Sequence, residues 1–149
     1  MSFRYPLQKI VDLKGSEKSM AEWEYAASLG KLRSEEERLR ELHEERRGLE
    51  DELLVAAKRP TPLTELMATE RYMQVVDARI RRQNEGVRVA EDQVRKRQGQ
   101  LTDKMVDEKV WLNARDRALE RFRRDRLAKE QNELDEIAIV RAASSSSRR

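Results

Sequence analysis

The chain has 149 residues, of which 41% are charged and 38% hydrophobic, and it contains no cysteine. Ordinary globular domains carry about 25% charged and 45–50% apolar residues, so this composition excludes a thick hydrophobic core and favours long helices and coiled coils. Without cysteine there is no disulfide framework and no thiolate, and the single histidine, His43, is too little for a histidine-rich metal site. We therefore predict a non-enzyme with no catalytic residue, no metal site and no cofactor.

The net charge of +3 is a small difference between 32 basic and 29 acidic residues, as is usual for helix surfaces that carry many ion pairs. No apolar run approaches the roughly 20 residues that span a bilayer, and the N-terminus lacks the apolar stretch of a signal peptide. The sequence therefore predicts a soluble, intracellular protein.

Two long helices are predicted, separated by Pro60 and Pro62, the only strong break in the interior. Proline removes a helical hydrogen bond and biases the preceding residue away from helix. Thr61 is expected to cap the second helix, with Pro62 at its first position. The predicted bounds are 6–58 for helix one, 59–61 for the loop, 62–141 for helix two and 142–149 for a serine-rich, disordered tail.

Apolar residues of helix two recur every seven residues, which is the spacing of a coiled coil. The series is Leu66, Met73, Ile80, Val87, Val94 and Leu101. Helix one has the same spacing at Leu32, Leu39 and Leu53, and at Leu42, Leu49 and Ala56. Met105, Leu112 and Leu119 are seven apart in a different phase, which predicts a stutter after Leu101. Arg46 takes a core-type position, where a charged residue costs stability but favours one register.

A loop of a few residues can only return the chain alongside itself, so the fold class is predicted to be all-α, an antiparallel coiled-coil hairpin. We expect a single unit over residues 1–141, in which each residue of helix one faces the residue whose number is about 121 minus its own, such as Ile80 opposite Leu42. Helix two is longer, so residues 115–141 are expected to overhang the start of helix one without a partner.

This overhang combines an apolar stripe with basic residues, and a helix that exposes such a stripe is an unfinished interface. We predict that it binds another chain, by docking in a groove or by insertion into the centre of a ring. The residues expected to carry this binding are Arg115, Leu119, Phe122, Arg123, Arg126, Leu127, Leu134 and Ile137.

Seven basic residues and three acids lie between Arg115 and Lys129, followed by four acids over residues 130–136. Basic helices can bind phosphates, but aromatic residues for base stacking are few, and Asp116 and Glu120 interrupt the positive charge. Nucleic acid is therefore not the expected partner. A nucleic-acid-binding arm and a structural coiled coil that self-associates weakly through the overhang stay open as alternatives.

Three segments are more distinctive than the heptads. They are Phe3-Arg-Tyr-Pro-Leu-Gln-Lys-Ile-Val-Asp-Leu-Lys14 with Glu17-Lys18, Glu70-Arg-Tyr-Met-Gln-Val-Val76, and Asn132-Glu-Leu-Asp-Glu-Ile-Ala-Ile-Val-Arg141. These segments resemble those of the flagellar export protein FliJ family, and the chain length agrees. The resemblance covers nearly the whole chain, with its specific motifs at the two ends.

The resemblance implies a two-helix coiled coil similar to the central stalk subunit of rotary ATPases, acting as a non-catalytic component of flagellar type III secretion. It implies three partners: the hexameric export ATPase, whose assembly and activity such proteins promote; the cytoplasmic domain of the export gate protein FlhA; and empty substrate chaperones. It also implies a cytoplasmic protein peripherally associated with the inner face of the cell membrane at the flagellar base.

The family's gate-binding surface lies on both helices towards the loop end of the hairpin. Aligned through the proline break, Leu42, Tyr72 and Val76 match that surface in residue type, so the resemblance assigns them to gate binding. Glu45 and Leu49 stand where some members carry aromatic residues, and there the sequence departs from the family.

Overall fold

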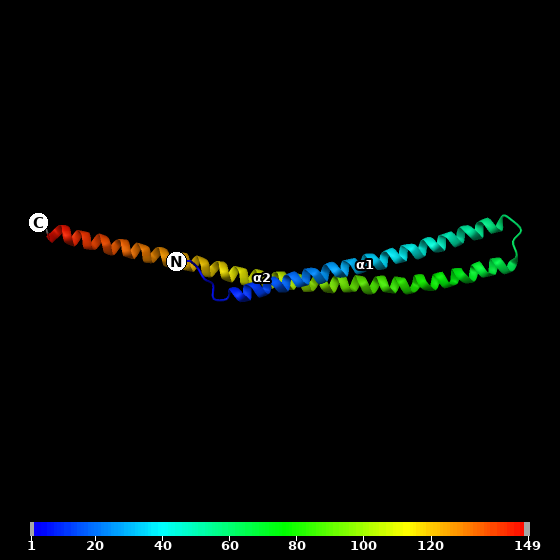
Figure 1. The fold of residues 1–149 in the computed structure, drawn as a ribbon, viewed down its shortest axis with the longest axis horizontal. Helices are drawn as coiled ribbons and strands as arrows, with labels where there is room; N and C mark the ends of the chain where they lie inside the picture. Colours follow the sequence, from blue (N-terminus) through cyan, green and yellow to red (C-terminus); the bar gives the residue numbers. More distant parts are fainter. Residues whose placement is uncertain (1, 148–149) are drawn as a thin grey trace. The chain divides into compact units, whose positions relative to one another are not determined.

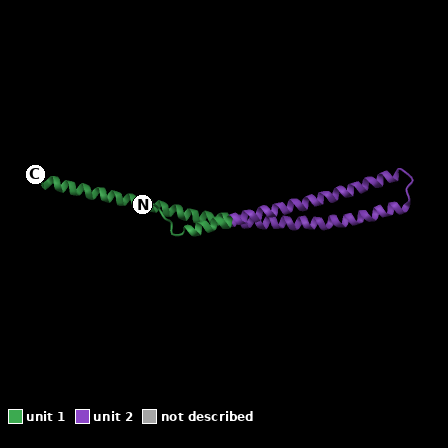
Figure 2. Cartoon of the chain, viewed as in Figure 1, with its two compact units in different colours: residues 1–18, 104–149 green, residues 19–103 purple. Residues whose placement is uncertain are grey.

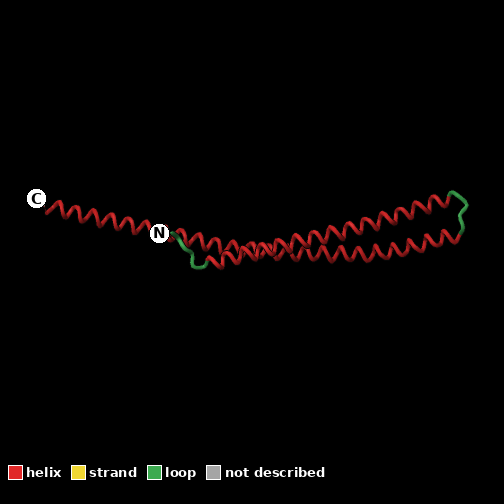
Figure 3. The backbone as a smooth tube through the Cα atoms, viewed as in Figure 1, coloured by secondary structure: helices red, strands yellow, loops and turns green. Residues whose placement is uncertain are grey.

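The computed structural model describes residues 2–147, which form two helices, α1 (Gln8–Ala57) and α2 (Leu63–Ser147), joined by a short loop (Figures 1 and 3). No strand occurs in this part of the chain. The predicted all-α helical hairpin is confirmed, with 50 residues in α1 and 85 in the longer α2.

The loop between the helices lies where the prolines predicted it. α1 ends at Ala57 and α2 begins at Leu63, each within one residue of the predicted bound. Pro60 and Pro62 stand outside both helices, because a proline inside a helix removes a backbone hydrogen bond and clashes with the preceding turn.

Thr61 caps the end of α1 and not, as predicted, the start of α2. Its hydroxyl donates to the carbonyl oxygens of Ala56 at 2.9 Å and Arg59 at 3.2 Å. The last carbonyls of a helix have no partner within the helix, so a nearby hydroxyl donor satisfies them. At the start of α2, the carbonyl of Pro62 accepts the backbone N–H of Glu65 at 3.1 Å.

α2 continues to Ser147, beyond the predicted end at residue 141. Residues 142–147 are two alanines and four serines, with no glycine or proline to force the helix to stop. The stretch predicted as a disordered tail is therefore helical over residues 142–147, while residues 148–149 lie outside the described residues.

Close packing divides the chain into two compact units, where the sequence predicted a single one (Figure 2). Unit 1 comprises residues 1–18 and 104–149, and unit 2 comprises residues 19–103. Each unit contains a stretch of α1 and a stretch of α2.

In unit 2 the two stretches pack antiparallel through an apolar seam (Figure 1). The best-buried cluster is Leu49, Val76 and Ile80, against which Leu39, Leu42 and Met73 pack. All six residues of the predicted α2 heptad series are buried or half-buried. Arg97 donates to the Glu24 carboxylate at 2.7 Å, which agrees with the predicted register. Arg46 keeps its core-type position and forms an ion pair with Asp77 on the opposite helix.

In unit 1 charged residues occupy the seam. Three ion pairs join α1 to α2: Lys14 with Asp107 at 2.9 Å, Lys18 with Glu108 at 2.8 Å, and Glu17 with Lys104 at 3.3 Å. All six residues are half-buried, and they lie in the same unit as Val11, the one buried apolar residue of the described part of unit 1.

The predicted stutter in α2 is wrong. Met105 and Leu112 are 52% and 39% exposed, whereas Glu108, Arg115 and Phe122 are half-buried and continue the phase of the earlier series. The stutter was inferred from apolar residues alone. Charged side chains can fill core-type positions when ion pairs compensate them, so the register holds while the chemistry of the seam changes.

Candidate partner-binding sites

The N-terminal segment, residues 2–7, covers the first part of the predicted overhang. Beside it, Gln8 accepts a hydrogen bond from Nε of Arg115 at 2.7 Å, and the ring of Phe3 lies 5.4 Å from that of Phe122 between centroids. Leu119 is half-buried as well. Three of the residues predicted to meet a partner, Arg115, Leu119 and Phe122, are thus covered by the chain itself. The cover reaches further than predicted because a non-helical segment spans more length per residue than a helix does.

Beyond Phe122 the end of α2 forms a free arm, residues 123–147, in which every residue is exposed. Figure 1 shows no other segment beside this orange-to-red end of the helix. The arm contains the remaining residues predicted to bind a partner: Arg123, Arg126, Leu127, Leu134 and Ile137. Leu127 and Leu134 are 66% and 61% exposed, so the predicted apolar stripe is present and uncovered in the described residues.

The basic run around the start of the arm is partly paired within its own helix. Arg124 lies 2.8 Å from Glu120, and Arg126 lies 3.4 Å from Glu130, each pair one helical turn apart. Exposed pairs of this kind contribute about 0.3–0.5 kcal/mol each.

Of the three residues that the resemblance assigns to gate binding, only Tyr72 has an exposed side chain. Val76 is fully buried, and Leu42 is half-buried against the same cluster. The Tyr72 hydroxyl donates to the carboxylate of Glu45 on the opposite helix, and this hydrogen bond raises the pKa of Tyr72. Val76 therefore belongs to the buried seam of unit 2 and is not an exposed residue.

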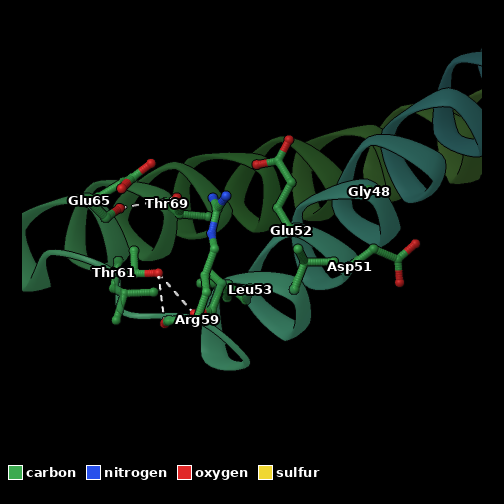
Figure 4. Close-up of a pocket in the computed structure, with 11 residues that line it drawn as sticks. Gly48, Asp51, Glu52, Leu53, Arg59, Thr61, Glu65 and Thr69 are labelled. Carbon is green, nitrogen blue, oxygen red and sulfur yellow. Dashed lines mark hydrogen bonds between the residues drawn. The ribbon is translucent and has the colours of Figure 1, made fainter.

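A groove of about 410 Å³ lies between the helices next to the loop, and the sequence did not predict it (Figure 4). Apolar residues of this loop-end groove are Leu53, Val55, Ala56 and Leu66, and its acidic residues are Asp51, Glu52 and Glu65. The sequence does contain a feature that could have indicated the groove. Ala56 and Thr69 are small residues at heptad positions that usually hold leucine or isoleucine. Small side chains beside a stiff proline loop leave the seam partly open.

Within residues 2–147 no group of three or more histidine or acidic side chains is arranged to hold a metal ion, and His43 is exposed. Neither α1 nor the described length of α2 contains a stretch apolar enough to span a membrane.

Antiparallel helices with an exposed arm at one end of α2 define a helical-hairpin protein. The family model for the flagellar FliJ protein matches residues 3–147, and the chain belongs to this family. The family predicted from the distinctive segments is therefore confirmed.

Two known proteins illustrate the relationship. The chain is 24% identical over 139 residues to the flagellar FliJ protein of Bacillus subtilis (strain 168), covering 93% of this chain and 95% of that protein. A solved structure of CT670 from Chlamydia trachomatis, a proposed YscO homolog, has the same fold. Its TM-score is 0.70 at 18% identity, over 99% of this chain and all of that one.

Family membership identifies the chain as a component of flagellar type III protein export. The family consists of non-catalytic export components.

Proposed function

We propose that the chain acts as a stalk-like export protein whose free arm docks on the hexameric export ATPase and promotes its assembly and activity. The observation that carries this proposal is the complete exposure of residues 123–147. Leu127, Leu134 and Ile137 are spaced by seven and three residues, which places them on one face of the helix. Covering exposed apolar surface stabilises a complex by about 25 cal/mol per Å², so the arm gains stability when a partner encloses it.

The same proposal extends to the other end of the hairpin. There the exposed ring of Tyr72 would contact the cytoplasmic domain of the export gate protein FlhA, above the buried Val76 and half-buried Leu42. The chain would thereby link ATPase and gate while escorting empty substrate chaperones, as a cytoplasmic protein held at the inner face of the membrane at the flagellar base.

The ATPase role is tested by the hydrolysis rate of the cognate export ATPase, measured with the intact chain and with a Leu127→Ser/Leu134→Ser variant. The intact chain should raise the rate, and the variant should lose most of that increase. Val89→Ser is the matched control, because Val89 is similarly exposed (56%) but lies in unit 2. Equal stimulation by parent and arm variant, or none by the intact helical chain, would contradict the proposal.

The gate role is tested by the affinity of the chain for the FlhA cytoplasmic domain. Tyr72→Ala should weaken binding by about tenfold, as expected for an aromatic residue in an interface centre. Tyr72→Phe should retain most of the affinity if the ring makes the contact. Unchanged binding by Tyr72→Ala would remove this surface from the proposal without affecting the role of the arm.

A further inference from the structure

The seam of unit 2 opens towards the loop. Leu49 is buried, whereas the core-type residues nearer the loop, Leu53, Ala56, Leu66 and Thr69, are only half-buried and line the loop-end groove. The Thr69 hydroxyl donates to the backbone carbonyl of Glu65 on its own helix at 3.2 Å, so it does not bridge the seam. The groove therefore has an apolar floor that a protein side chain could fill.

The sides of the groove are acidic. Asp51, Glu52 and Glu65 contribute three carboxylates against one basic residue, Arg59. None of the three has an ion-pair partner among the described residues, whereas their neighbour Glu50 pairs with Arg46 on the same helix. Figure 4 shows Glu52, Arg59 and Glu65 extending to one side of the helices. An excess of unpaired negative charge beside an apolar floor selects for a ligand that is apolar and basic.

We propose that the loop-end groove binds an amphipathic helical segment of a partner protein. Leucine-like side chains of that segment would enter the apolar floor beside Val55 and Leu66, and its lysine or arginine residues would face Glu52 and Glu65. Helix-in-groove docking uses this arrangement of apolar anchors and flanking charges. The inference goes beyond the proposed function because it assigns a surface apart from the free arm and from Tyr72, and it holds whichever export protein supplies the segment.

The test uses two short model peptides of the same pattern, one built of leucine and lysine and the other of leucine and glutamate. Each is titrated into the intact, isotope-labelled chain while amide NMR signals of Gly48 and Thr69 report on the groove. The leucine–lysine peptide should shift both signals, and the leucine–glutamate peptide should not. A Glu52→Gln/Glu65→Gln variant should weaken the shift-derived affinity about three- to tenfold, since each exposed charge pair contributes up to about 1 kcal/mol.

Two controls separate the groove from the rest of the surface. Val55→Ser should weaken binding while Val89→Ser, at a similarly exposed position (59% and 56%), should not. The Glu133→Gln/Glu136→Gln variant, changed on the free arm, should show the same peptide-induced shifts of Gly48 and Thr69 as the parent. The proposal is overturned if the lysine peptide leaves Gly48 and Thr69 unshifted, if the glutamine variant binds as tightly as the parent, or if the groove signals shift with chain concentration alone, which would indicate a second copy as the occupant.

Discussion

The two units use one heptad geometry with two different chemistries. Unit 2 closes most of its seam with apolar side chains, among which Val76 has no exposed surface, whereas unit 1 combines the buried Val11 with ion pairs such as Lys18 with Glu108. Burying an aliphatic side chain contributes about 1.5–3 kcal/mol, while a partly exposed ion pair contributes about 0–1 kcal/mol. Unit 2 contains more buried apolar residues, so we expect it to contribute more to the stability of the hairpin and unit 1 to open more easily.

This difference matters because the easily opened unit also contains the surfaces proposed for the ATPase. Release of α1 from unit 1 would uncover Arg115, Leu119 and Phe122, in addition to the arm that is already free. Local openings of low free energy are usual for elements that must rearrange on binding.

The largest expected effect is on the apolar seam. Ile80→Ala removes a buried side chain (8% exposed) and should lower the free energy of unfolding by about 2–4 kcal/mol, because a cavity replaces the lost contacts. Urea unfolding followed by circular dichroism measures this change. Val89→Ala on the exposed face of α2 should change stability by less than about 0.5 kcal/mol. Equal losses in the two variants would show that the cluster does not hold the hairpin.

Salt should distinguish the two units. Raising the salt concentration from about 0.1 M to about 1 M shortens the Debye length from roughly 10 Å to roughly 3 Å. Amide hydrogen exchange should then become several-fold faster around Lys104 and Glu108 and stay unchanged around Val76 and Ile80. A Lys18→Leu/Glu108→Leu variant replaces one of the three interhelix ion pairs of unit 1 with an apolar pair and should show a smaller salt response. Faster exchange in both units would remove the distinction between them.

Acid should have a smaller effect, through a carboxylate in unit 2. Hydrogen bonds from Lys31 and then Gln83 lower the pKa of Glu35 from its ordinary 4.5. A lowered pKa contributes stability that is present above the ordinary value and is lost as the pH falls through the folded-state value. The parent should therefore lose more stability than Glu35→Gln between neutral pH and pH values below 4.5. Parallel stability curves for the two proteins would contradict this assignment.

The smallest expected effect is at the loop end. The hydrogen bond to Glu45 raises the pKa of Tyr72 above its ordinary 10.0, so its contribution is complete below that value and is lost as the pH rises through the folded-state value. Ultraviolet titration of tyrosinate in the parent, compared with Tyr72→Phe, isolates this group from Tyr5 and Tyr25. The midpoint of Tyr72 ionisation should lie at higher pH in the parent than in Glu45→Gln. Identical midpoints would show that the hydrogen bond is absent in solution.

Proline positions and apolar spacing were enough to predict most of the fold. They located the loop within one residue and predicted the seam of unit 2, because both signals are local and have a fixed period. Counting apolar residues failed after Leu101, since Glu108 and Arg115 face inward for reasons that lie on the other helix. The end of α2 was missed because polar serines favour disorder only weakly when no residue breaks the helix.

The candidate sites were harder to predict than the fold. The spacing of Leu127 and Leu134 identified the arm, but the cover on Phe122 depends on a non-helical segment whose path no heptad specifies. Val76 matched a surface position by residue type and is nevertheless buried, because alignment does not report which side of the helix a residue takes. The loop-end groove depends on the volumes of residues on two helices, so it appears only when they are brought together.

The extended N-terminal segment also determines where the free arm begins. Gln8 contacts Arg115, and Phe3, five residues earlier in the sequence, contacts Phe122, seven residues further along α2. Every residue inserted or deleted ahead of Gln8 would therefore move the boundary of the free arm by more than one residue of α2. The number of residues between Phe3 and Gln8 therefore sets how much of α2 is left exposed in this chain.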